Sequence, residues 1–177
     1  IACCNAVTII STRGGVSFDA LGRRAIRTLR ERGTSVVCTI KLSADEKAEL
    51  MTLLAAVVPP IHVCYKVNGE QVSAAALVET ATETLPTEIA DAEGFLRPSS
   101  RAAEMQFIRK HGDEARLYEM GIPVCLVELP VSVNVMQKIP LTMDRESVRP
   151  AYLKRIAELA LKYCHQRIAT DELRKPW

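Results

Sequence analysis

Two short segments carry residue types suited to phosphate chemistry. Gly33-Thr34 opens a β-rich stretch, and a Gly-Thr turn can bring backbone N–H groups close to a phosphate. Gln137-Lys138 follows another extended stretch, so the Lys138 ammonium group can reach a terminal phosphate from a rigid strand end. Neither segment is specific alone, because a Gly-Thr pair is also an ordinary turn and a strand-end lysine is usually solvated. The sequence therefore indicates nucleotide chemistry only where the two segments are considered together.

The pattern of apolar residues predicts the elements that position the first segment. β-branched residues concentrate in three predicted strands, at 6–12, 16–18 and 34–42. Ser43 is followed three residues later by Glu46, which is a capping box and predicts the start of a helix. Pro59-Pro60 ends that helix, whose apolar residues share one stripe. Gly33-Thr34 therefore enters a strand that leads into a capped helix.

The second segment belongs to a run of predicted strands followed by a helix. These strands are expected at 61–67, 84–91, 101–108, 122–129 and 131–139. Asn68-Gly69 predicts a hairpin, because both turn positions need positive φ. Residues 122–129 are apolar nearly throughout, which predicts a central strand. Pro150 begins a helix with an apolar stripe formed by Leu153, Ile156, Ala157, Ala160, Leu161 and Cys164.

Together these elements predict an α+β fold with mixed, mostly antiparallel sheets and packing helices. A soft domain boundary is expected near Pro59-Pro60, which divides the chain into residues 1–58 and 59–177. In the second part, Ala103, Met105 and Phe107 alternate with polar residues and are expected to share one face of a strand.

Composition limits the possible classes of protein. The chain of 177 residues has a formal net charge of +2, without the concentrated basic face expected of a nucleic-acid-binding protein. The basic run from Arg23 to Arg32 is interpreted as a solvated hairpin or loop. No apolar run approaches the ~20 residues that span a bilayer, and no signal-peptide pattern occurs, so a cytoplasmic protein is expected. The chain begins at Ile1 rather than Met, which predicts that it belongs to a longer protein.

Cysteine and histidine usage predicts no metal site. Six cysteines occur without any C-x-x-C spacing: Cys3, Cys4, Cys38, Cys64, Cys125 and Cys164. Most lie in apolar patterns, which predicts buried, reduced thiols in the core rather than disulfides or zinc ligands. The histidines are scattered without ligand spacing, at His62, His111 and His165.

The segments around the two phosphate candidates resemble a known superfamily. Residues 11–15 (Ser-Thr-Arg-Gly-Gly) and 32–36 (Arg-Gly-Thr-Ser-Val) resemble the closing part of a GHKL, or Bergerat-fold, ATP-binding domain. That superfamily includes the gyrase B subunit, MutL, a heat-shock chaperone and histidine kinases. Residues 118–124 and 137–141, with Asp144-Arg145, resemble phage and bacterial GHKL proteins of the rapid-lysis-inhibitor type. The similarity runs from about residue 7 to residue 163.

This resemblance implies that two parts of the chain belong to domains with different roles. Residues 1–58 would be the C-terminal part of the ATP-binding domain, and residues 59–177 a transducer-like domain with a C-terminal helix. Lys138 would be the catalytic residue that senses the γ-phosphate, while Gly33, Thr34 and Gln137 would join it in binding the nucleotide. The implied partners are ATP, the upstream half of the nucleotide-binding domain and a second copy in a homodimer. The nucleotide state would then control the relative movement of the two domains.

The chain departs from the superfamily pattern in two respects. The gyrase-type motif has a threonine between its glutamine and its lysine, whereas Gln137 and Lys138 are adjacent. The helix-borne asparagine that holds Mg²⁺ and the Asp-x-Gly-x-Gly loop that binds adenine are not visible in this sequence. We expect both upstream of Ile1, so that ATP and Mg²⁺ act in the intact parent and this chain alone does not hydrolyse ATP.

Two other classes of function remain open from the sequence. A non-catalytic module that docks a protein or nucleic acid is supported by the basic run 23–32 and by the missing ATP motifs. A stand-alone enzyme using cysteine and histidine is the third possibility, although no Cys/His pair has a recognisable arrangement.

Overall fold

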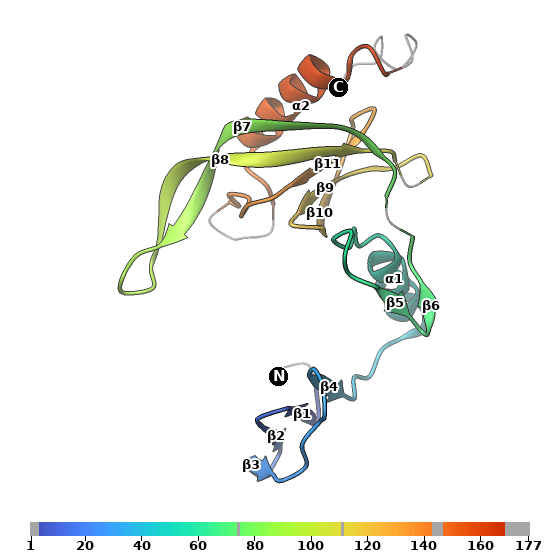
Figure 1. Cartoon of the computed structure of the whole chain (residues 1–177), viewed down its shortest axis with the longest axis vertical. Helices are drawn as coiled ribbons and strands as arrows, with labels where there is room; N and C mark the ends of the chain where they lie inside the picture. The colour runs from blue at the N-terminus through green and yellow to red at the C-terminus, as the bar shows by residue number, and fades with distance from the viewer. Residues whose placement is uncertain (1–3, 74, 111, 143–146, 169–177) are drawn as a thin grey trace. The chain divides into compact units, whose positions relative to one another are not determined.

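A computed structural model describes residues 4–73, 75–110, 112–142 and 147–168 (Figure 1). Within these residues it contains two helices and three mostly antiparallel sheets, which confirms the predicted α+β class. The chain divides into two compact units, Ile1–Leu50 and Met51–Trp177. This division falls within α1 (Ala44–Ala55), whereas the sequence predicts a boundary after residue 58.

Unit 1 is built on a four-stranded antiparallel sheet in the order β3-β2-β1-β4. Its strands are β1 (Val7–Ser11), β2 (Gly14–Asp19), β3 (Gly22–Ile26) and β4 (Ser35–Cys38). β4 is shorter than the strand predicted at 34–42. The basic residues Arg23 and Arg24 are exposed on β3, which forms a hairpin with the half-buried strand β2.

Side-chain hydrogen bonds confirm the predicted start of α1. The Ser43 hydroxyl accepts a hydrogen bond from the Glu46 N–H at 3.2 Å, and the Ser43 N–H donates to Glu46 Oε2 at 2.7 Å. These reciprocal bonds satisfy donors that the first turn of a helix leaves without intrahelical partners.

A small hairpin follows α1 in sequence. Its strands are β5 (Lys66–Val67) and β6 (Glu70–Gln71), so the strand predicted at 61–67 is much shorter than expected. Asn68 and Gly69 have φ of 52° and 88°, which confirms the turn predicted from their sequence.

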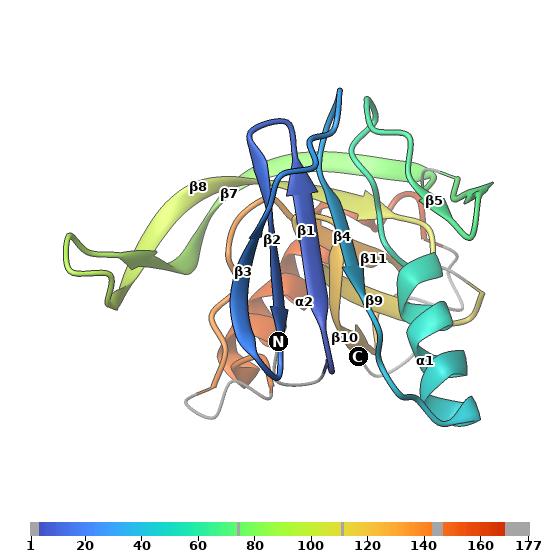
Figure 2. The ribbon, with the colours of Figure 1, turned by 90° about the horizontal axis from the view of Figure 1, so that it is seen from below.

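Unit 2 contains a five-stranded sheet in the order β10-β9-β11-β8-β7. Its strands are β7 (Leu77–Ala90), β8 (Leu96–Ile108), β9 (Ala115–Glu119), β10 (Ile122–Val127) and β11 (Ser132–Val135). β11 enters between β8 and β9, running antiparallel to β8 and parallel to β9. The paired ends of β7 and β8 extend beyond the other strands (Figure 2).

The core of unit 2 lies between this sheet and α2 (Pro150–Cys164). Ala103, Met105 and Phe107 are buried there, as their alternation with polar residues predicts. The predicted helix forms, but its buried face is rotated from the expected stripe, because Leu161 is 46% exposed. The buried residues of α2 are Tyr152, Ile156, Leu159, Ala160 and Cys164.

One strand prediction is wrong in position. The apolar segment 122–129 was expected to form a central strand, but β10 lies at the edge of the sheet. Its residues alternate between exposed and half-buried, with Ile122 63% and Leu126 56% exposed. The central place belongs to β11, all four of whose residues are buried. The neighbouring strand β9 was not predicted.

Glu83 joins β7 to the last turn of α2 and should make stability depend on pH. The Lys162 ammonium group donates to its carboxylate at 2.7 Å, and the Tyr163 hydroxyl donates at 2.6 Å. Both hydrogen bonds lower the pKa of Glu83, and the bond from Lys162 has the larger effect. A lowered carboxyl pKa contributes stability above the unfolded-state value of about 4.3, and this stability is lost as pH falls through the folded-state pKa.

Glu83→Gln is therefore expected to lower the melting temperature at pH 7 and to lower it by less at pH 3. Thermal unfolding of the full-length protein at both pH values measures this difference. Glu128→Gln is the control, because it neutralises an exposed carboxylate of unit 2. Glu158 is less suitable, because its partner Arg155 also lies 3.5 Å from Glu83. Equal effects of Glu83→Gln at the two pH values would contradict the assignment.

Candidate functional site

The backbone around Lys138 is held by side chains of two strands of the five-stranded sheet, β7 and β9. The Thr87 hydroxyl, on β7, donates to the Lys138 carbonyl at 2.8 Å. The Ile139 N–H donates to Glu119 Oε2, on β9, at 2.7 Å. Lys138 therefore follows the buried strand β11 on a segment that hydrogen bonds from Thr87 and Glu119 hold in place.

The structure places the Gln137 side chain against the backbone of β7. Its amide nitrogen donates to the carbonyls of Leu85 and Pro86, at 3.2 and 3.4 Å. These bonds help to hold the segment that carries Lys138. This structural role was not predicted for Gln137, for which the resemblance implies contact with a nucleotide.

The Lys138 side chain belongs to a small charged group. Lys138 Nζ lies 3.4 Å from Glu88 Oε2, and Arg149 Nη2 lies 3.3 Å from Glu88 Oε1. We call Glu88, Lys138 and Arg149 the Glu88 cluster. Its carboxylate is the least exposed member, at 18%, compared with 34% for Lys138 and 48% for Arg149. Two solvent-accessible cations thus share one carboxylate.

This arrangement is chemically suited to an anion. A lysine on a flexible stem can leave one oxyanion for another, and phosphate oxygens are strong acceptors for ammonium groups. The same cluster also has a purely structural effect, because it ties β7 to the segment before α2. Partly exposed ion pairs of this kind contribute at most about 1 kcal/mol to stability.

The structure places Gly33 and Thr34 in unit 1, directly before β4. Both residues are exposed, and Gly33 has φ of 69° with no neighbouring atom where a Cβ would stand. Gln137 and Lys138 belong to unit 2. Neither unit by itself therefore contains both halves of the predicted nucleotide site. Asp144-Arg145 lies outside the described residues.

The described cysteines correct another expectation. Cys38 and Cys64 are exposed rather than buried in a core, while Cys125 is half-buried and Cys164 is fully buried. Burial raises the pKa of the Cys164 thiol to about 11 and also raises the pKa of Cys125. A nucleophilic cysteine requires the opposite shift, so these two thiols do not support the cysteine-enzyme hypothesis.

The described residues hold no group of three or more His, Cys, Asp or Glu side chains positioned to bind a metal ion. They also include no helix of sufficient length and apolar character to cross a membrane. Comparison with family models, curated proteins and solved structures finds no match to this chain.

Sequence reasoning missed Glu88 and Arg149 as neighbours of Lys138. Glu88 lies within a strand of alternating pattern and Arg149 directly before the first residue of α2. No local motif marks either residue. Glu88 is separated from Lys138 by 50 residues along the chain, so only the side-chain contacts of the folded protein reveal the cluster.

Proposed function

We propose that this chain is part of a GHKL-type protein that binds and hydrolyses ATP, and that it couples the γ-phosphate state to domain movement. The observation that carries the proposal is the position of Lys138. Its backbone is held from β7 and β9, while its side chain remains one-third exposed beside a single carboxylate. A cation carried at a fixed backbone position can stabilise charge on a transferred phosphoryl group.

The sheet of unit 1 also supports the proposal. In an antiparallel sheet, directly paired residues share a face, and the observed register pairs Val7 with Phe18 and Ile9 with Val16. Continued across the sheet, this face carries Val7, Ile9, Val16, Phe18, Ala25, Val36 and Cys38, with Arg23 at its border.

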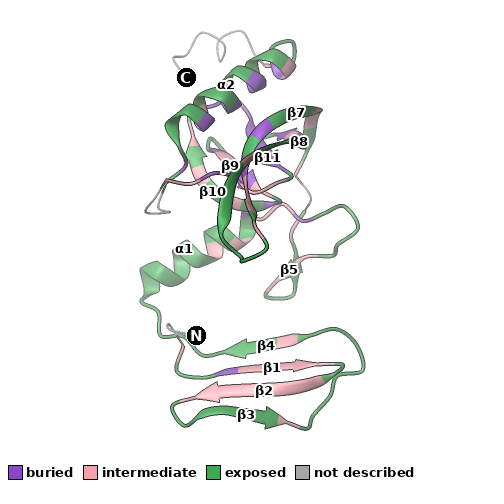
Figure 3. Ribbon diagram, turned by 90° about the vertical axis from the view of Figure 1, so that its left-hand side faces the viewer, coloured by how far each residue is buried: buried purple, intermediate pink, exposed green. Residues whose placement is uncertain are grey.

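This apolar face is only partly covered. Among the described residues of unit 1, Val7 alone is buried, and Val36 is 62% exposed. Figure 3 shows β1 to β4 coloured mainly as intermediate and exposed. A sheet with one apolar face is stable when a second layer covers that face. An ATP-binding domain completed by further secondary structure would supply such a layer, as the resemblance implies.

The proposal places ATP binding in the intact protein. The described residues offer no metal-binding group, so we assign no Mg²⁺ ligand to this chain. Its own contribution is the closing sheet, with Gly33 and Thr34 at the entry to β4, and the Lys138 segment. Gln137 would act on the nucleotide only through its effect on the position of Lys138.

Equilibrium titration of the intact parent protein with ATP and with ADP tests the proposal. We expect tighter binding of ATP than of ADP, and we expect Lys138→Ala to remove most of this preference, about tenfold or more for a charge-assisted contact. Lys154→Ala, which changes an exposed lysine of α2, should leave both affinities unchanged. A wild-type protein that binds neither nucleotide would overturn the proposal.

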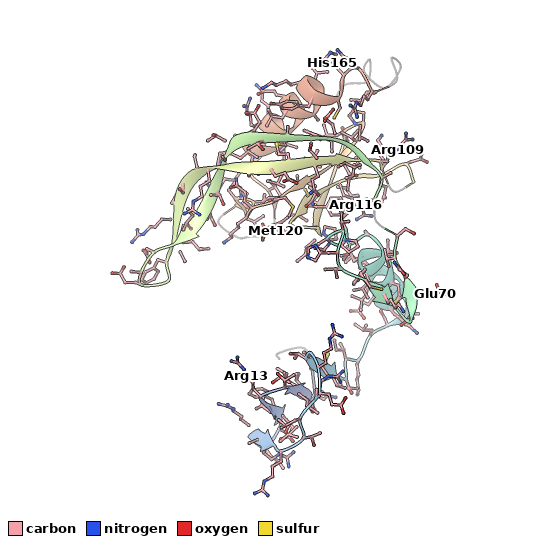
Figure 4. The ribbon with its side chains drawn as sticks, viewed as in Figure 1. Arg13, Glu70, Arg109, Arg116, Met120 and His165 are labelled. Atoms are coloured by element: carbon pink, nitrogen blue, oxygen red, sulfur yellow. The ribbon has the colours of Figure 1, made fainter. Side chains whose placement is uncertain are left out.

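A second candidate function is a non-catalytic interaction module, and exposed apolar side chains of unit 2 favour it. Met120, at the β9–β10 turn, is 51% exposed (Figure 4), and β10 exposes Ile122 and Leu126. A cavity of about 270 Å³ beside Met120 is lined mainly by apolar residues, including Ile61, Leu77 and Met136.

These features fit a protein partner better than a nucleic acid. Arg23 and Arg24 alternate along β3 and therefore point to opposite faces, and Arg24 is paired with Asp19. Salt-dependent binding of the full-length protein to DNA would instead support a nucleic-acid partner.

A further inference from the structure

We infer that Glu88 competes with the nucleotide phosphate for the Lys138 ammonium group. We also infer that Arg149 keeps Glu88 paired when Lys138 moves to the nucleotide. This inference rests on the proposed function. It adds two residues that the resemblance does not name and assigns them a regulatory role. Glu88 would hold Lys138 in the absence of nucleotide and release it when a γ-phosphate is present.

The geometry of the Glu88 cluster permits one cation to leave without the other. Lys138 approaches Oε2 of the carboxylate, whereas Arg149 approaches Oε1. The two contacts therefore use separate oxygens. Departure of Lys138 leaves Arg149 in place, so that the partly buried carboxylate keeps a charged partner and the penalty for an unpaired buried charge is avoided.

The two cations also differ in how firmly they are held. The Arg149 guanidinium donates a further hydrogen bond from Nε to the Leu141 carbonyl at 2.9 Å, and Arg149 directly precedes the first turn of α2. Lys138 reaches Glu88 at 3.4 Å with a single flexible stem. Lys138 is therefore the member that exchanges partners, and Arg149 is the member that stays.

This competition should lower the apparent affinity for nucleotide. A ligand that needs a free Lys138 binds in proportion to the fraction of molecules in which Lys138 is released from Glu88. Neutralising Glu88 should raise that fraction. Removing Arg149 should lower it, because the whole charge of the carboxylate would then be available to Lys138.

The experiment measures the chemical reactivity of the Lys138 amine in the full-length protein, by limited acetylation and mass spectrometry. Glu88→Gln keeps the size of the side chain and removes its charge, and we expect it to raise Lys138 labelling about threefold. Arg149→Gln should lower Lys138 labelling. Lys154 serves as the internal reference, and Glu158→Gln serves as a control that disrupts a different exposed pair.

Repeating the labelling with a non-hydrolysable ATP analogue distinguishes failure of this inference from failure of the proposed function. In the wild type, a non-hydrolysable ATP analogue should protect Lys138 from labelling, and Glu88→Gln should bind the analogue more tightly. Unchanged Lys138 labelling in Glu88→Gln overturns the competition, even if the wild type binds ATP. A wild type that binds no ATP overturns the proposed function instead, and with it the nucleotide role of the cluster.

Discussion

Lys138→Ala is expected to lower ATP turnover by the intact parent protein about 100-fold, the effect typical of removing one group that stabilises transition-state charge. The fold should remain intact, because the lost ion pair with Glu88 is partly exposed and contributes less than about 1 kcal/mol. The backbone contacts that place residue 138, from Thr87 and Glu119, do not involve its side chain. Steady-state phosphate release measures turnover, and thermal unfolding measures stability.

Two variants sharpen this comparison. Lys154→Ala removes an exposed lysine of the same unit and should leave turnover unchanged. Lys138→Arg keeps the positive charge, and partial recovery of turnover would indicate that charge at this position matters more than the shape of the ammonium group. Wild-type turnover in Lys138→Ala would eliminate the catalytic role of Lys138.

Gly121→Ala should destabilise unit 2 by about 3 kcal/mol, since overpacking and backbone strain act together. Gly121 is buried at the β9–β10 turn with φ of 86°, and an added Cβ would lie 2.1 Å from the Val58 carbonyl oxygen. The Gly121 carbonyl accepts a hydrogen bond from the Val58 N–H at 2.9 Å, and the Gly121 N–H donates to buried Asn134 at 2.8 Å. Movement of Val58 to relieve the clash would disrupt this contact.

Gly94→Ala is the matched control for Gly121→Ala. Gly94 has nearly the same φ, 88°, but an added Cβ there would meet no atom within 4 Å. Gly94→Ala should therefore lower stability only through backbone strain, by about 1–2 kcal/mol. Hydrogen exchange of the β9 and β11 amides in the full-length protein measures the difference. Equal destabilisation by the two substitutions would show that the contact with Val58 has no effect.

Several local features of this protein were predictable because neighbouring residues decide them. Ser43 and Glu46 are three residues apart, so their reciprocal hydrogen bonds need nothing beyond the first turn of α1. Asn68-Gly69 forms its turn because its two residues tolerate positive φ. The alternation of Ala103, Met105 and Phe107 likewise follows from the pleat of a single strand.

The order of the strands required the tertiary structure. Segment 122–129 is apolar enough for a central strand, but β11 occupies the place between β8 and β9 and leaves β10 at the edge. Hydropathy shows that a strand can be buried, and it does not show which partners will bury it. The same limit explains the rotated face of α2, because the sheet beneath a helix decides which residues of its apolar side are covered.

The candidate site also combines features that the sequence predicts with features that only the tertiary structure reveals. The sequence by itself determined that a lysine follows an extended segment and that a Gly-Thr pair enters another strand, since both are local patterns. Only the tertiary structure brought Glu88 and Arg149 to Lys138, and only it placed Gln137 against the carbonyls of β7. The physical reason is that local conformational preferences extend over a few residues, whereas these ion pairs join side chains from segments that lie far apart along the chain.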